Sequence, residues 1–447
     1  MTASPDQPGS LFDYLVAPGG RLNGRLRVPG DKSISHRSVM LGALATGQTR
    51  VSGLLEGEDV LATLAAFRAM GVEAEGPRDG TLLIRGAGLQ GLRAPAGALD
   101  MGNSGTAMRL MAGILSGQAF DSVLIGDESL SNRPMGRVAE PLSAMGARIE
   151  TASGGRPPLR IRGGQRLRGI DYRLPVPSAQ VKSALLLAGL YAEGETRVSE
   201  PAPTRDHTER MLRGFGYPVE TRDGTISLRG GGTLSGCAID VPADISSAAF
   251  FLVGAAMTPG SNLVLEHVGV NPTRIGVLNI LRAMGAAIEV VNERTIGGEP
   301  VADLRVTGGR LHGIAIPRDQ VPLAIDEFPA LFVAAACAEG TTSLTGAAEL
   351  RVKESDRIAV MAEGLRRLGV DARETPDGLV IAGGRELRGG EIDSHGDHRV
   401  AMAFSMAALQ AQGPIRVRDG RNVATSFPGF AALAGRAGLR IRAVAPD

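Results

Sequence analysis

The sequence predicts an α/β fold made of two similar domains, each built from three copies of one repeated unit. Three observations support this prediction. Six glycine-rich hairpin segments recur along the 447 residues, an apolar helical segment follows each hairpin of the series, and an amphipathic helical segment comes next. Repetition of this kind indicates a supersecondary unit that buries its apolar face only against its neighbours.

Each unit begins with a hairpin rich in glycine that ends in a polar turn. Examples are "GGRLNGRLRVPGD" near the N-terminus and "GGRLHGIAIPRD" in the second half of the chain. The segment "GAGLQG" matches the dinucleotide fingerprint G-x-G-x-x-G, but "LRAPAGALD" follows it where a nucleotide site needs a helix. We therefore interpret this segment as one more hairpin.

Two helical segments of different character follow each hairpin. The first is apolar nearly all round, as in "GTAMRLMAGILSG" and "SSAAFFLVGAAMTPG", which predicts a buried helix. Glycine closes most of these segments, as is typical of helix C-termini. After a short strand, the second segment is apolar on one face only and is expected to face water.

The order of the units predicts how the two domains close. The sixth unit ends near the C-terminus with no hairpin after it, whereas the chain begins with a hairpin that no helix precedes. The simplest closure lets the N-terminal strands, around Tyr14 to Val28, complete the sheets of the last units. The chain then crosses between domains near Pro29 and near Val241. We predict a discontinuous domain of residues 1–30 and 243–447, and an inserted domain of residues 31–242.

Composition excludes several classes of function. The net charge of +1 gives no reason to expect binding to nucleic acid or to a membrane surface. No uninterrupted apolar stretch reaches the roughly 18 residues of a membrane helix, and the first 20 residues hold no signal-peptide pattern. Cys237 and Cys337 lie far apart in apolar segments, which indicates small buried side chains in a reducing compartment. We expect a cytoplasmic protein.

Charged and small side chains collect just before the buried helices. The free N–H groups of a helix N-terminus favour anions, and "NSGTAMRLM" shows the pattern most clearly. The chain contains only three lysines, and each precedes or opens an apolar segment. One such loop is more simply a capped turn with solvated charges, but several together predict a single anionic site. The loops carry Lys32, Ser33, Arg37, Ser178, Gln180, Lys182 and Arg399.

Carboxylates accompany these cations. The segment "RVKESDR" places Lys353 and Arg357 one turn apart, with Glu354 between them, and "AIDEFPALF" offers Asp326 before a buried helix. Acids among cations normally stay ionised, which suits a base and hampers an acid.

Several segments together resemble the 5-enolpyruvylshikimate-3-phosphate (EPSP) synthase family. They are "PGDKSISHRS", "GNSGTAMRL", "RPMGRV", "PSAQVKSALLLAGL", "TRDHTERML", "RVKESDR", "DHRVAM" and "ATSFPGF", and the third and fourth are similar to its class II branch. The resemblance implies two inverse α/β barrel domains of six βαβαββ units, with the active site in the cleft between the domains. It also implies transfer of the enolpyruvyl group of phosphoenolpyruvate to the 5-hydroxyl of shikimate 3-phosphate, with release of phosphate and without cofactor or metal.

The resemblance assigns a role to each matching residue. It places shikimate 3-phosphate on Lys32, Ser33, Arg37, Ser178, Ala179, Gln180, Arg205, Asp326 and Lys353. It places phosphoenolpyruvate on Lys32, Gly105, Arg133, Gln180, Arg357 and Arg399. Asp326 resembles the base for the 5-hydroxyl proton, and Glu354 resembles the acid that protonates the methylene carbon. Lys32 is the other candidate for that proton, and the sequence leaves the choice open.

Some positions depart from the family pattern. Thr425 stands where other branches place a lysine, and Glu349 stands where they use an asparagine, so neither is assigned a contact. Gly105 leaves the phosphoenolpyruvate pocket open, whereas an alanine in some class II members excludes the herbicide glyphosate. We therefore expect glyphosate to inhibit. We also expect a monomer that closes when shikimate 3-phosphate binds.

Two other functions remain as alternatives. The sister enzyme that transfers enolpyruvyl to UDP-N-acetylglucosamine shares the repeats, but commonly uses a cysteine in a loop that here reads "GDESLSNRPMG". A non-catalytic scaffold that binds anionic metabolites needs the basic loops but not the acids. The roles of Lys182, with only a helix-start position, and of His398, more simply structural than catalytic, stay open.

Overall fold

The computed structural model describes residues 12–446, so the first eleven residues of the predicted N-terminal segment and residue 447 lie outside it. The chain forms two compact units. The discontinuous unit comprises the described part of Met1–Pro29, together with Pro242–Arg294 and Pro300–Asp447; the inserted unit comprises Gly30–Val241 and Thr295–Glu299. Each boundary between the units lies one residue before the domain boundary predicted from the sequence. Residues 295–299, which were predicted to belong to the discontinuous domain, group with the inserted unit.

Three sheets belong to the inserted unit, and all have the same plan. In each sheet, an edge strand pairs in parallel with a central strand. On its other side, that central strand pairs antiparallel with one strand of a hairpin, which completes the sheet. The strand orders are β14(Ala238–Asp240)-β3(Gln48–Ser52)-β5(Thr81–Arg85)-β4(Glu73–Arg78), β6(Leu99–Asp100)-β7(Ser122–Ile125)-β9(Arg156–Arg162)-β8(Arg148–Ala152), and β10(Asp171–Arg173)-β11(Glu195–Ser199)-β13(Thr225–Arg229)-β12(Glu220–Arg222).

The three sheets of the discontinuous unit repeat this plan with one shortened member. Their orders are β16(Ala287–Ile296)-β17(Glu299–Thr307)-β15(Asn262–Gly269)-β2(Asn23–Leu26), β18(Thr341–Leu344)-β20(Gly378–Ala382)-β19(Asp371–Thr375), and β21(Gly390–Asp393)-β22(Ile415–Arg418)-β1(Asp13–Val16)-β23(Ile441–Val444). In the three-stranded sheet, isolated parallel bridges such as His312 to Glu339 stand in place of the edge strand. The predicted fold of six repeated units, three in each domain, is confirmed.

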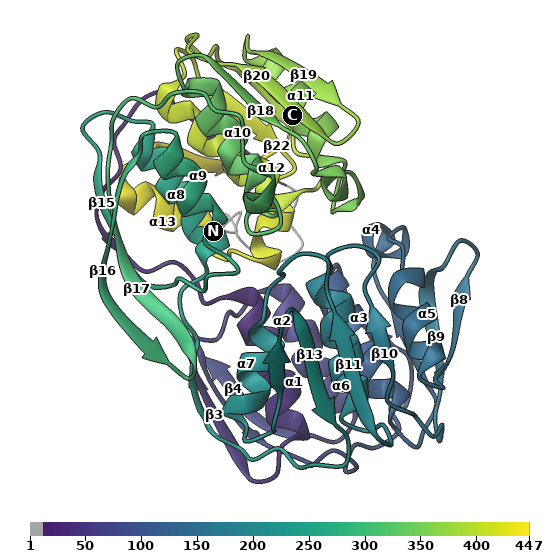
Figure 1. Ribbon diagram of the computed structural model, residues 1–447. Coiled ribbons are helices and arrows are strands. Elements are labelled where there is room, and N and C mark those ends of the chain that lie inside the picture. Colours follow the sequence, from purple (N-terminus) through teal and green to yellow (C-terminus); the bar gives the residue numbers. More distant parts are fainter. Residues whose placement is uncertain (1–11, 447) are drawn as a thin grey trace. The chain divides into compact units, whose positions relative to one another are not determined.

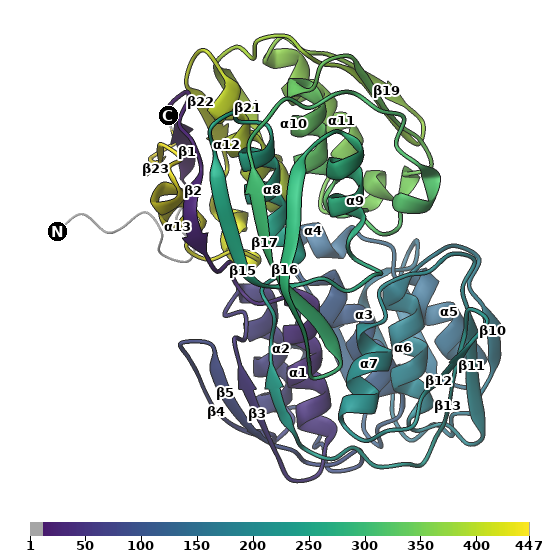
Figure 2. The ribbon, with the colours of Figure 1, turned by 60° about the vertical axis from the view of Figure 1, so that its left-hand side comes forward.

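Both ends of the described chain close the discontinuous unit. Strand β1 pairs with β22 on one side and with β23 on the other, and β2 runs parallel to β15 (Figure 2). The hairpin that the sixth unit lacks is thus assembled from the first and last strands. The prediction that N-terminal strands complete the sheets of the last units is confirmed.

The sheets lie outside and helices lie inside each unit (Figure 1). The first helices of the six repeats are α1(Lys32–Leu44), α3(Gly105–Ser116), α6(Ala179–Gly189), α8(Ile245–Ala256), α10(Phe328–Cys337) and α12(His398–Ala407). The second helices are α2(Glu58–Ala69), α5(Gly136–Ala144), α7(His207–Gly214), α9(Gly276–Ala283), α11(Arg357–Arg367) and α13(Phe430–Ala437), and a short α4(Glu128–Ser131) precedes α5. Every residue of α8 is buried, whereas α11 buries one face, as the two apolar patterns predict.

Side chains cap the buried helices at their N-termini. Asp31, Ser104, Ser178, Asp244 and Asp397 each accept a hydrogen bond from a backbone N–H in the first turn of the helix that follows. Such caps satisfy donors that the helix itself cannot pair. They fix the helix starts on which most of the predicted site residues lie.

Residues 295–299 comprise the end of β16, the turn at Gly297 and Gly298, and the first residue of β17. Arg210 Nη1 of α7 donates to the carbonyl of Gly298 at 2.9 Å, and Glu299 Oε1 lies 2.9 Å from His207 Nδ1. These contacts explain why the turn groups with the inserted unit while its strands belong to the other. No helix within residues 12–446 has the length and apolar character needed to cross a bilayer.

Candidate active site

In the inserted unit, the N-terminal turns of α1, α3 and α6 meet. His36 of α1 lies 3.4 Å from the hydroxyl of Ser104, which caps α3, and its other ring nitrogen lies 2.8 Å from Thr63 Oγ1. Burial, reinforced by Lys32 and Arg37, lowers the pKa of His36 well below its usual value. His36 is therefore neutral near pH 7 and joins two helix starts without adding charge.

Lys32 stands at the first position of α1. Its Nζ donates to Asp59 Oδ2 at 3.0 Å, and its side chain keeps 17% of its surface exposed. Asp59, in the first turn of α2, is almost fully buried. A buried carboxylate that holds this half-buried ammonium fixes the position of the lysine, and nothing in the sequence revealed this partner.

Gly105 begins α3 among three polar side chains. Arg109 Nη1 donates to Gln180 Oε1 at 2.6 Å, and Gln180 Nε2 donates to Thr106 Oγ1 at 2.9 Å. A Cβ atom added at Gly105 would lie 2.9 Å from Arg109 Nη1 and 3.3 Å from Arg133 Nη1. The predicted residues Gly105, Arg133 and Gln180 are thus brought together, with Arg109 as a member that sequence reasoning missed.

Arg133 is held by neighbours of the same loop region. Its Nη2 donates to Asn103 Oδ1 at 2.7 Å and to Ser129 Oγ at 3.2 Å, and only 7% of the residue is exposed. Asn103 in turn donates to Asp127 at 2.7 Å. The guanidinium therefore has a defined orientation beside Gly105.

Arg37 is deeply buried between α1, α6 and α7. It donates to Ser33 O, Ser183 Oγ and Thr208 Oγ1 at 2.7–3.0 Å. Burial, followed by repulsion from Arg205, lowers the pKa of Arg37 to about 10, although Glu209 and Asp31 oppose the change. Every guanidinium nitrogen of Arg37 has a protein acceptor, whereas Ser33 of the same helix is half-buried.

The start of α6 carries three predicted residues. Ser178 Oγ accepts from Val181 N, and Ser178, Ala179 and Gln180 are all half-buried. Arg205 is also half-buried, and it lies close enough to Arg37 for repulsion between the two guanidinium groups to lower the pKa of Arg37. This end of the helix therefore presents backbone N–H groups and a nearby cation, as an anion site requires.

In the discontinuous unit, Arg357 lies at the centre of a group of carboxylates. Its Nε donates to Asp397 Oδ2 at 2.8 Å, and its Nη2 donates to Glu354 Oε2 at 2.6 Å. Burial disfavours the charge, but Asp397, Glu354 and Asp326 outweigh it and raise the pKa of Arg357. Conversely, burial alone would raise the pKa of Asp397, but Arg357 holds it below its usual value. Both groups therefore stay charged at neutral pH.

Asp326 faces two cations in the same cluster. Its Oδ1 lies 3.3 Å from Lys353 Nζ and 3.5 Å from Arg357 Nη1. Arg399 Nη1 donates to the backbone carbonyl of Asp326 at 2.8 Å and lies 3.7 Å from Glu327 Oε1. All five residues predicted for this unit, Asp326, Lys353, Glu354, Arg357 and Arg399, are brought together.

A buried network lies behind this cluster, and of its members only Glu327, adjacent to Asp326, stood out in the sequence. Asp397 caps α12 through Arg399 N at 2.9 Å and also accepts from Ser355 Oγ at 3.1 Å. Glu327 accepts from Ser246 Oγ, which accepts in turn from Arg274 Nη2 at 2.6 Å. The only indication of Glu327 and Asp397 in the sequence is their position, because each directly precedes the apolar segment of a buried helix, α10 and α12 respectively.

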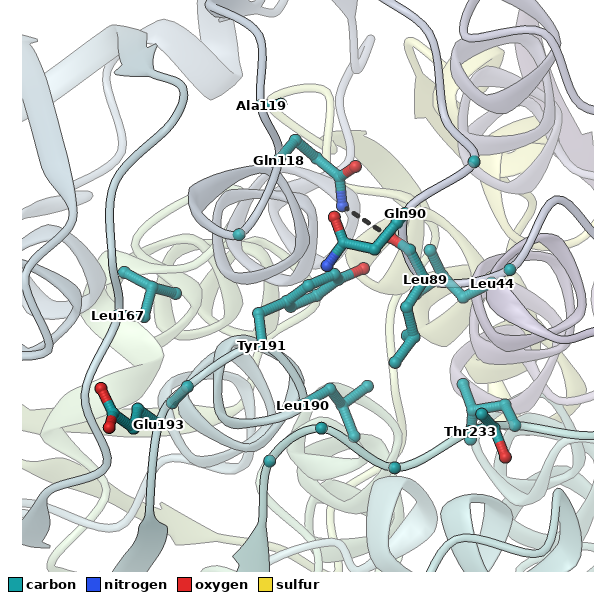
Figure 3. A pocket seen from close by; sticks show the side chains of 18 of the residues that line it. Leu44, Leu89, Gln90, Gln118, Ala119, Leu167, Leu190, Tyr191, Glu193 and Thr233 are labelled. Atoms are coloured by element: carbon teal, nitrogen blue, oxygen red, sulfur yellow. Dashed lines mark hydrogen bonds between the residues drawn. The ribbon is translucent and has the colours of Figure 1, made fainter.

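A cavity of 990 Å³ lies at the opposite end of the three buried helices of the inserted unit (Figure 3). Leu44, Gln118 and Leu190 line it where α1, α3 and α6 end, together with glycine-rich loops. Gln118 Nε2 donates to Leu89 O at 3.3 Å across the wall. None of the residues predicted from sequence for the site contributes to its lining. This cavity is therefore separate from the charged helix starts.

Comparisons with known proteins identify the family. Residues 16–433 match the family model described as EPSP synthase (3-phosphoshikimate 1-carboxyvinyltransferase). The 3-phosphoshikimate 1-carboxyvinyltransferase of Alkalilimnicola ehrlichii is 67% identical over 96% of both chains, and that of Methylococcus capsulatus is 66% identical over 96% of this chain and 98% of its own. The structure of EPSP synthase from Acinetobacter baumannii is 61% identical, with a TM-score of 0.87, over 97% of this chain and 100% of that one. The chain belongs to the EPSP synthase family.

Proposed function

We propose that this chain transfers the enolpyruvyl group of phosphoenolpyruvate to the 5-hydroxyl of shikimate 3-phosphate and releases phosphate. The observation that carries the proposal is the cluster in which Asp326 lies between Lys353 and Arg357 while Glu354 pairs with the same guanidinium. Carboxylates fixed among cations provide both proton transfer and a place for anionic substrates. The alternative of a non-catalytic scaffold does not require these acids.

The inserted unit supplies most of the proposed site for shikimate 3-phosphate. The proposed set is Lys32, Ser33, Arg37, Ser178, Ala179, Gln180, Arg205, Asp326 and Lys353. The N-terminal turn of α6 and Arg205 bind the phosphate, because free N–H groups and a guanidinium both favour that anion. Ser33 and Lys32 bind the ring of shikimate 3-phosphate and its carboxylate. Arg37, although buried, contributes to this same part of the site.

Phosphoenolpyruvate takes cations from both units in this proposal. The set is Lys32, Gly105, Arg133, Gln180, Arg357 and Arg399. Arginine forks match carboxylate and phosphate geometry and keep their charge when crowded. Two substrates with several negative charges repel each other, so cations on both sides lower the cost of holding them together.

The proposed reaction has two stages. A proton reaches the methylene carbon of phosphoenolpyruvate from Glu354 or Lys32, the neighbouring carbon gains oxocarbenium character, and the 5-hydroxyl oxygen bonds to it while Asp326 accepts the hydroxyl proton. The tetrahedral adduct then returns a proton from its methyl group to Glu354 or Lys32, whichever donated the first one. Its bond to the phosphate oxygen breaks, and phosphate leaves with the electron pair of that bond and takes up the proton held by Asp326. Lys353 and Arg357 hold the Asp326 carboxylate in place to accept the hydroxyl proton. We place the reaction in the cytoplasm and in a monomer.

A phosphate-release assay tests the proposal directly. Phosphate is expected to appear only when shikimate 3-phosphate and phosphoenolpyruvate are both present, and the mass of the product should equal that of the acceptor plus the enolpyruvyl group. Release with UDP-N-acetylglucosamine as acceptor, and none with shikimate 3-phosphate, would assign the chain to the sister reaction. Binding of both ligands without any release would instead support the scaffold.

A further inference from the structure

Lys182 is one of three lysines in the chain, and it does not lie at the surface of the predicted site. Its side chain, on the first turn of α6, is 1% exposed. Its Nζ lies 3.1 Å from Glu200 Oε1, 2.9 Å from Glu209 Oε1 and 3.4 Å from the carbonyl of Thr204. The contacts with Glu200 and Thr204 are hydrogen bonds, and the contact with Glu209 is an ion pair. The ammonium is therefore buried and held by partners within the protein.

The same acceptors organise the loop of residues 200–206, which joins β11 to α7. Glu200 Oε1 accepts from Thr204 N at 3.1 Å, and Glu200 Oε2 accepts from Thr204 Oγ1 at 2.6 Å. The Glu200 side chain is 8% exposed, so water competes little for these bonds. Glu200 thus stabilises the loop through its hydrogen bonds with Thr204, and Lys182 links the loop to α6.

Arg205 directly follows Thr204 in this loop, and Ser178 and Ala179 lie at the start of the helix that carries Lys182. The buried ammonium of Lys182 therefore connects the loop that carries Arg205 to the N-terminal turn of α6. The connection is also balanced in charge, because Lys182 faces Glu200 and Glu209, and Glu209 also attracts Arg37. A neutral set of this kind tolerates burial far better than a single charge.

We propose that Lys182 is a positioning residue, which sets the distance between Arg205 and the start of α6 and thereby determines affinity for the phosphate of the acceptor substrate. The inference rests on the proposed function, since it assumes that Arg205 and the α6 N-terminus bind that phosphate. Lys182 touches no substrate. Lys182 acts through Glu200 and Thr204. Its loss should therefore lower the affinity for shikimate 3-phosphate and leave the affinity for phosphoenolpyruvate unchanged.

Two variants and a matched control test this role. Thr204→Val removes the hydroxyl donor to Glu200 without adding a buried charge, and Lys182→Met removes the fastening itself. Thr196→Val is the control, because Thr196 on β11 is fully buried and its hydroxyl has no hydrogen-bond partner. Each enzyme is checked for cooperative thermal unfolding. KM for each substrate, kcat and binding of shikimate without its phosphate are then measured.

Thr204→Val is expected to raise KM for shikimate 3-phosphate about tenfold, the effect of one displaced charge-assisted hydrogen bond. KM for phosphoenolpyruvate, kcat and the affinity for shikimate should stay within about twofold. Lys182→Met should show a larger rise, and Lys182→Arg should recover part of it. Thr196→Val should match the unmodified enzyme.

A folded Thr204→Val enzyme with an unchanged KM for shikimate 3-phosphate would overturn the positioning role, as would equal rises in KM for both substrates. If Lys182→Met fails to fold, Thr204→Val still decides. Failure of the proposed function gives a different result, because the unmodified chain would then release no phosphate from the two substrates.

Discussion

Asp326→Asn is expected to lower kcat about a thousandfold, within the range that general-base catalysis contributes. The amide cannot accept the hydroxyl proton, but it keeps the shape of the carboxylate and an oxygen toward Lys353 and Arg357. Binding of shikimate 3-phosphate should therefore persist, with a Kd changed less than about tenfold by the loss of one charged contact. Phosphate release and calorimetric binding measure the two quantities separately.

Asp371→Asn provides the matched control for that result. Asp371 lies on β19 of the same unit, with about half of its side chain exposed and an arginine 3.7 Å away, and it belongs to neither cluster. Its turnover should equal that of the unmodified enzyme. If Asp326→Asn keeps full turnover, Asp326 is not the base, and a different group accepts the hydroxyl proton.

Gly105→Ala is expected to make the enzyme resistant to glyphosate, with inhibition weakened at least about tenfold. The added methyl group would lie 2.9 Å from Arg109 Nη1 and 3.3 Å from Arg133 Nη1, which is closer than Cβ atoms normally approach. One or both guanidinium groups must therefore move. Since Arg133 belongs to the proposed phosphoenolpyruvate site, KM for phosphoenolpyruvate should also rise, whereas KM for shikimate 3-phosphate should change little. Steady-state inhibition by glyphosate measures this.

Gly97→Ala serves as its control in the same unit, because a Cβ atom there would meet nothing within 4 Å. Its kinetics and its sensitivity to glyphosate should match those of the unmodified enzyme. Strong turnover of the unmodified enzyme in millimolar glyphosate would contradict the expectation that Gly105 leaves the pocket open. Equal sensitivity of Gly105→Ala and the unmodified enzyme would show that the methyl group does not reach the inhibitor site.

The repeated units could be predicted because each repeat carries its own complete pattern. A hairpin, an apolar helix, a strand and an amphipathic helix are local signals, and the missing hairpin of the sixth unit predicted how β1 and β2 are used. The turn at residues 295–299 carried no such signal. Its place depends on the length of β16 and β17 and on the guanidinium of Arg210, which donates to the carbonyl of Gly298 from 88 residues away in the sequence.

The site could be predicted only as far as residue type and position reveal charge. Lys32, Asp326 and Arg357 precede or open apolar segments and carry motifs of the family. Asp59 and Arg109 lie inside helices that look ordinary in sequence, and their importance comes from partners 27 and 71 residues away. Lys182 shows the opposite case, since its place at a helix start left a contact with ligand open, while in the fold its ammonium is buried against Glu200, Glu209 and Thr204.

We propose that cations of both units bind the same phosphoenolpyruvate molecule. KM for phosphoenolpyruvate in Arg133→Lys, from the inserted unit, and in Arg399→Lys, from the discontinuous unit, tests it most directly. Each variant keeps the charge but loses the fork, so KM should rise about tenfold or more in both. The exposed arginines at positions 162 and 418 provide lysine controls that should change nothing. If either site variant folds and keeps the original KM and kcat, the two units do not share this substrate.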